Sequence, residues 1–127
     1  MKKLPIVHNL REAINEVIKN NKEEGYPPNR FIQAVNVKDE DLLRVCSKMV
    51  TSPDSLSALY DAISKHPNLL TIEDFIVVHG EKWGFSSEII EECKKRVHYL
   101  MRSLERRDLV YMLNDIKPNY SHNHFAV

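Results

Sequence analysis

Glycine and long apolar runs are scarce in this 127-residue chain, and each scarcity excludes a class of structure. Three glycines leave little material for a β-sandwich or for a glycine-rich phosphate-binding loop. No stretch approaches the ~20 apolar residues of a membrane-spanning helix, and the N-terminus has no apolar core of signal-peptide length. We therefore expect a cytoplasmic protein that does not associate with membranes.

Cysteine is also scarce, and both copies fall on apolar stripes of predicted helices. Cys46 and Cys93 are surrounded by aliphatic residues at helical spacing, where a thiol behaves as a small hydrophobic side chain. We expect both to be buried free thiols rather than partners in a disulfide or ligands of a metal.

Motifs for catalysis and metal binding are missing from the sequence. It contains no nucleophile elbow, no Cys-x-x-Cys and no His-Glu-x-x-His, and we expect neither an enzyme nor a bound cofactor. His122 and His124 could ligate a metal together with His98 or His66, but alternate histidines in a polar loop more often only contact solvent. We expect no metal site.

The formal net charge of the chain is zero, because 18 basic residues balance 18 acidic ones. The balance is uneven along the chain, however. Residues 1–93 hold 11 Lys and Arg against 15 Asp and Glu, whereas residues 94–127 hold 7 against 3. A neutral chain would ordinarily argue against nucleic acid as a partner, but the basic C-terminal part reopens that possibility.

Helical periodicity dominates the first half of the chain. Residues 9–24 and 39–50 carry apolar side chains at intervals of three and four, and acidic residues occupy the first turn of the second segment. Between them lies Tyr26-Pro27-Pro28, which reads as an extended connector, or alternatively as a docking element for a partner. One short helical turn is expected near residues 31–37.

From residue 54 onward the order of elements changes. The pattern predicts a helix ending near residue 66, a brief apolar step at Leu69-Leu70, and a short helix that begins at Thr71. A turn of about six residues over 80–85 leads to a long helix over 86–107. A strand over 109–113, a polar loop over 114–124 and a short strand over 125–127 complete the pattern.

This order resembles the winged helix-turn-helix superfamily over residues 54–127. The segment LYDAISKHPNLLTIEDF is similar to the first two helices of winged-helix regulators, and CKKRVHYLMRSLERRDLVYML is similar to their recognition helix and following strand. The resemblance implies a mainly α fold: a winged-helix module over 54–127 with a small β-hairpin wing, preceded by a two-helix N-terminal extension over 1–53. That extension would pack on the core or form a dimer interface.

The same resemblance implies where double-stranded DNA would bind. The helix over 86–107 would enter the major groove and the loop over 114–124 would form the wing. Basic and histidine side chains on these elements become the candidate contacts, and they are Lys94, Lys95, His98, Arg102, Arg106 and Lys117. The other interpretation of the basic helix is a solvated face whose charges suit the C-terminal end of the helix dipole.

Two features of this segment favour a different partner. The predicted turn is longer than the ~3–4 residues usual in a helix-turn-helix. Glu88, Glu91 and Glu92 occupy the leading end of the long helix and would repel phosphate. Trp83, in the turn, either plugs the core or offers an exposed aromatic to a partner.

The sequence therefore predicts a DNA-binding regulator of transcription or replication that acts as a homodimer, since two-fold operators match two-fold proteins. The alternative is an adaptor that uses the same fold to bind another protein.

Overall fold

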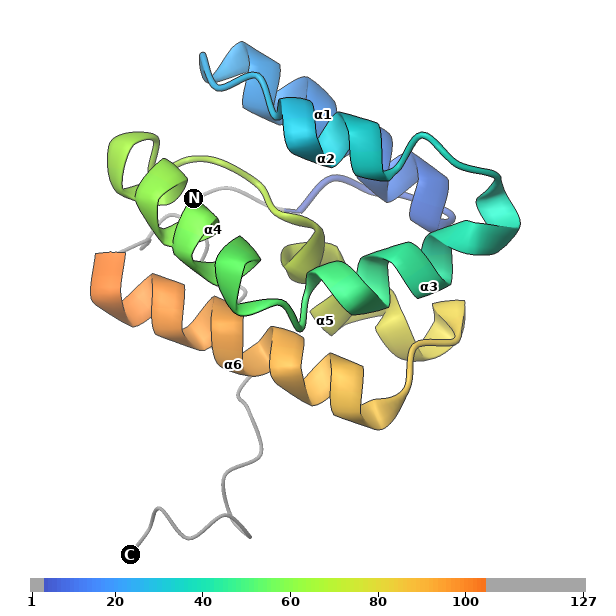
Figure 1. Cartoon of the computed structure of the whole chain (residues 1–127). Coiled ribbons are helices and arrows are strands. Elements are labelled where there is room, and N and C mark those ends of the chain that lie inside the picture. The colour runs from blue at the N-terminus through green and yellow to red at the C-terminus, as the bar shows by residue number, and fades with distance from the viewer. Residues whose placement is uncertain (1–3, 105–127) are drawn as a thin grey trace, which may run out of the picture.

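Six helices and no strand make up residues 4–104, the part of the chain that the structure, a computed structural model, describes (Figure 1). The prediction of a mainly α protein is confirmed. None of these helices is long and apolar enough to cross a membrane. The helices are α1 (Leu10–Glu23), α2 (Asn29–Ala34), α3 (Asp39–Met49), α4 (Pro53–Lys65), α5 (Ile72–Trp83) and α6 (Ser87–Leu104).

Local signals set the helix ends. The side chain of Asn9 accepts a hydrogen bond from the backbone N–H of Glu12 and caps α1. Thr71 and Asp74 form a reciprocal capping box at the start of α5. Pro53 occupies the first turn of α4, where its missing N–H would have had no helical partner. Gly84, with φ of 96°, ends α5 in the left-handed conformation that favours glycine.

Helix α5 organises the core. It packs along α6 and against α1, while α1 also contacts α3 and α4 contacts α6. Side chains from both sides of the division predicted at residue 53 join one apolar cluster, among them Ile14, Leu42, Cys46, Phe75, Ile76 and Cys93. A second, smaller cluster joins α4 to α6 through Ile63 and Leu100, with Leu69 from the segment before α5. Both cysteines are buried and free, as expected.

The winged-helix prediction is wrong. The apolar step at Leu69-Leu70, which would be a short strand in a winged helix, is a connector without strand pairing, and the N-terminal part holds three helices instead of two. A physical reason lies in α1, because Asn20 and Asn21 take up both backbone polar groups of Leu70 and leave none for a strand partner. The predicted β-hairpin, with strands over 109–113 and 125–127 and the wing loop over 114–124, lies outside the described residues.

The turn expected over 80–85 is also shorter than predicted. Helix α5 continues through Gly80 to Trp83, and only residues 84–86 separate it from α6. Gly80 stays in the helix because it lets α6 approach closely: a Cβ there would lie 2.9 Å from Cγ1 of Ile90. Gly80 therefore allows two helices to pack closely, whereas from the sequence alone a glycine at this position predicts the end of a helix.

Candidate functional site

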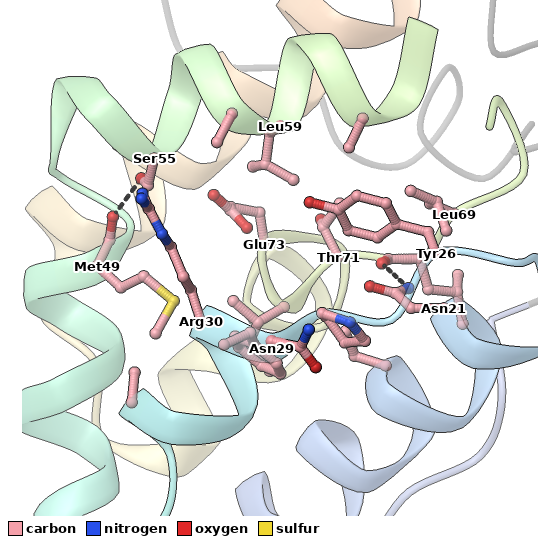
Figure 2. Close-up of a pocket in the computed structure, with 18 of the residues that line it drawn as sticks. Asn21, Tyr26, Asn29, Arg30, Met49, Ser55, Leu59, Leu69, Thr71 and Glu73 are labelled. Carbon is pink, nitrogen blue, oxygen red and sulfur yellow. Dashed lines mark hydrogen bonds between the residues drawn. The ribbon is translucent and has the colours of Figure 1, made fainter. Parts of the chain in front are cut away.

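A groove of about 640 Å³ runs between α4 on one side and the α1–α2 connector with α2 on the other. Figure 2 shows its side chains, with α4 above and the connector below, and the start of α5 between them. The lining is mostly apolar. Among its members are Val17, Pro27, Pro28, Phe31, Ala34, Met49, Ala58, Leu59, Ala62, Leu69, Leu70 and Ile72.

One end of the groove is closed by contacts between α1 and the segment before α5. The Asn20 side chain accepts a hydrogen bond of 2.8 Å from the backbone N–H of Leu70, and Asn21 donates one of 3.0 Å to the Leu70 carbonyl. The rings of Tyr26 and His66 lie 5.8 Å apart at a tilt across the same end. These contacts fix the spacing of the two walls there.

The floor of the groove contains a buried ion pair between α5 and α6. Glu73 and Arg96 are each only 3% exposed, and Nη1 of Arg96 lies 3.3 Å from Oε2 of Glu73. The same guanidinium donates to Oγ of Ser55 at 2.8 Å and to the carbonyl of Ser52 at 2.7 Å. Arg96 therefore ties the first turn of α4 to α5 and α6 and holds the Glu73 carboxylate in place.

Burial and the neighbouring positive charge shift the pKa of Glu73 in opposite directions. Burial raises the pKa of Glu73 above its ordinary value, and the neighbouring guanidinium of Arg96 offsets that shift only in part. Glu92 lies on the far side of Arg96, with its Oε2 3.5 Å from Nε. The cluster thus contains two carboxylates around one guanidinium.

Asn21 is the second buried polar group that faces the groove. It is 5% exposed, and its amide nitrogen donates to Leu70 and to the side chain of Asn20. Its amide oxygen accepts no hydrogen bond from any described residue and is directed toward the groove in Figure 2. An acceptor of this kind is costly to leave without a donor unless water or a ligand supplies one.

Sequence reasoning missed Asn21 and Glu73 as site residues. Asn21 continues the stripe of Leu10, Ile14 and Val17 at helical spacing, so a polar residue on an apolar face was the available signal. Glu73 stands in the first turn of a helix, where an acidic residue is usually explained by the helix dipole alone. Its burial arises only from the packing of α4, α5 and α6.

The described candidate DNA contacts lie on α6 and away from the groove. Lys95 is exposed, whereas Lys94 forms an ion pair of 3.5 Å with Glu91, and His98 is half-buried. The backbone of Arg102 belongs to α6, but its side chain, Arg106 and Lys117 lie outside the described residues. The three whose side chains the structure describes, Lys94, Lys95 and His98, do not line the groove.

Two alternatives left open by the sequence are decided by position. Trp83 is half-buried, packs against the core and stacks on His79 at 4.9 Å, which agrees with a role in packing. The Tyr26-Pro27-Pro28 segment is a connector, as expected, and it forms part of the groove wall.

Metal binding has no counterpart in the described part of the chain, where no three His, Cys, Asp or Glu side chains gather closely enough to hold an ion. His122 and His124 lie outside that part.

Comparisons of the chain with protein-family models, with curated proteins and with solved structures found no match. The candidate site is therefore interpreted from its own geometry.

Proposed function

We propose that this chain is a protein-binding adaptor whose groove receives a segment of a partner protein. The observation that carries the proposal is the groove itself, a mostly apolar hollow of about 640 Å³ with buried polar groups at its floor. Hollows of this size, apolar with a few convergent polar groups, are the usual form of binding sites. Burial of apolar side chains would supply affinity, and the polar floor would supply orientation.

The openness of the groove favours a segment of a larger partner over an isolated small molecule. Residues of both rims are exposed, including Pro27 and Asn29 from the connector and Asp54 and Ala58 from α4. Small-molecule sites bury about 70–90% of their ligand. A ligand in this groove would remain exposed along one side, which suits a chain segment whose outer face belongs to the partner.

The test is selection of peptides from a random-peptide display library on the wild-type protein, followed by titration of the selected peptides. The blocking variant is Ala58→Trp, which places an indole on the α4 wall of the groove. The control is Ser57→Trp, at the neighbouring exposed position of the same helix, which does not line the groove. We expect the blocking variant to weaken binding at least about tenfold and the control to leave it unchanged.

The matched pair separates a blocked groove from a damaged helix. Both variants add the same bulk to exposed positions of α4, so a general effect on folding would appear in both. Failure to select any peptide, or equal binding by the Ala58→Trp variant and the wild type, would refute the adaptor proposal.

Duplex DNA binding is the other function expected from the sequence, and it stays a prediction. The winged helix that suggested it is not seen, and Arg96, which ends the basic run Lys94-Lys95-Arg96, is occupied by the ion pair at the floor of the groove. The exposed Lys95 and the basic composition of residues 94–127 still favour a test. Binding to duplex DNA at low salt, abolished by Lys95→Glu with Arg102→Glu, would support it, and no binding would refute it. The homodimer is likewise a prediction.

A further inference from the structure

We infer that the partner segment places a basic side chain, lysine or arginine, in the groove, with its charged head at the floor formed by Glu73 and Asn21. This inference rests on the proposed function and names the chemistry of the partner. It depends on three features of the groove: acceptor atoms at its floor, the balance of charge around it, and the apolar path that leads down to it.

Acceptor oxygens of Glu73 and Asn21 face the groove at its floor. Arg96 donates to one oxygen of the Glu73 carboxylate, which also accepts a hydrogen bond from the backbone N–H of Glu73 itself. The amide oxygen of Asn21 accepts no hydrogen bond from the described residues, because both contacts of this side chain are made by its nitrogen. In Figure 2 the hydroxyl of Tyr26 is directed across the groove toward the side of Glu73. A ligand group with several N–H donors would satisfy these oxygens together.

The charges around the groove also favour a cation. Arg30 and Arg96 carry positive charge, whereas Asp54, Glu73 and Glu92 carry negative charge when ionised. Two guanidinium groups against three carboxylates leave a formal charge of −1. The excess comes from Glu92, which pairs with Arg96 but is 40% exposed and does not line the groove. A cation beside the Glu73 carboxylate would offset this charge.

The path from the rim to the floor matches the stem of a basic side chain. Leu59, Leu69 and Ile72 are apolar and line the groove near the buried groups. Lysine and arginine bury their methylene stems along apolar surfaces while the head reaches a polar partner. An aliphatic side chain would match the walls but would leave the oxygens of Glu73 and Asn21 without donors, at a cost in affinity.

The experiment begins with the peptides selected on the wild-type protein that lose binding to the Ala58→Trp variant. We expect lysine or arginine to be enriched at one position of these peptides. The strongest binder and a copy with norleucine at that position are then titrated against the protein by fluorescence anisotropy. Norleucine keeps the stem and removes the charged head, so affinity for the wild type should fall about tenfold or more.

The variant Glu73→Gln connects that loss to the floor of the groove. It keeps the side-chain shape and removes the carboxylate charge, so the two peptides should differ by less than about threefold on this variant. Because Glu73 is paired with Arg96, folding of the variant is checked by circular dichroism, whereas the comparison of peptides on the wild type needs no such check.

The outcomes distinguish the two levels of the proposal. Peptides that require an open groove but show no basic position, or that bind equally well with norleucine, would overturn the basic side chain and leave the adaptor function standing. If no peptide is selected at all, the adaptor proposal and this inference both fail. A tenfold loss that persists unchanged in Glu73→Gln would place the basic head elsewhere and overturn the assignment to this floor.

Discussion

Replacement of Arg96 by methionine tests whether the buried ion pair holds the floor of the groove together. Arg96 is 3% exposed and donates to Ser55, to the carbonyl of Ser52 and to Glu73. Methionine preserves much of the volume but removes these donors and leaves Glu73 buried without its partner. Breaking a buried pair in this way costs about 3–5 kcal/mol. Domains of this kind are stable by about 5–15 kcal/mol in total, so the loss should be large.

Urea unfolding followed by circular dichroism at neutral pH measures this loss. A matched control is Lys94→Met, two residues earlier in the same helix, because its pair with Glu91 is about 30% exposed on each side and should contribute less than about 1 kcal/mol. The double variant Arg96→Met with Glu73→Leu should recover much of the stability, since an apolar pair can replace a buried ion pair. A change below about 1 kcal/mol for Arg96→Met alone would show that the reasoning is wrong.

Three further predictions concern packing, thiols and pH. Gly80→Ala should lower the free energy of unfolding by about 1–3 kcal/mol, because its Cβ would meet α6, and an unchanged urea midpoint would contradict the close approach. Cys46 and Cys93 should resist Ellman's reagent until the protein unfolds, because burial raises the pKa of both thiols. The pKa of Cys46 is raised to about 12. Rapid reaction of the native protein with the reagent would contradict this prediction. Because burial raises the pKa of Glu73, the folded state holds its proton more tightly than the unfolded state. The stability of the wild type relative to Glu73→Gln should therefore fall as pH rises from about 4.5 through the raised pKa, and a difference independent of pH would refute this.

Helix positions were predictable from the sequence because their signals are local. Asn9, Pro53 and Thr71 mark the starts of α1, α4 and α5, and the structure uses each of them as a cap or first-turn residue. The prediction was wrong where tertiary contacts override local signals. Gly80 remains helical because α6 packs against it, and Leu70 is held by α1 instead of pairing in a strand. An order of elements typical of a winged helix therefore did not determine the fold.

The groove could be predicted only in fragments. Its walls come from residues near 26–31, 52–62 and 69–73, and nothing in the sequence states that these segments meet. The docking interpretation of Tyr26-Pro27-Pro28 and the position of Asn21 on an apolar stripe were real signals of it. Arg96 sits beside the stripe of α6 among other basic residues, and its burial opposite Glu73 depends on how α4, α5 and α6 pack.

Chemical-shift mapping with a selected peptide tests the central claim most directly. Amide resonances of the isotope-labelled protein are followed as the peptide is added. The account predicts changes that concentrate at the groove, at Asn21, Tyr26, Ser55 and Glu73, with the amide of Lys95 on the outer face of α6 unaffected. Changes that concentrate around Lys95 and leave the groove unchanged would contradict it.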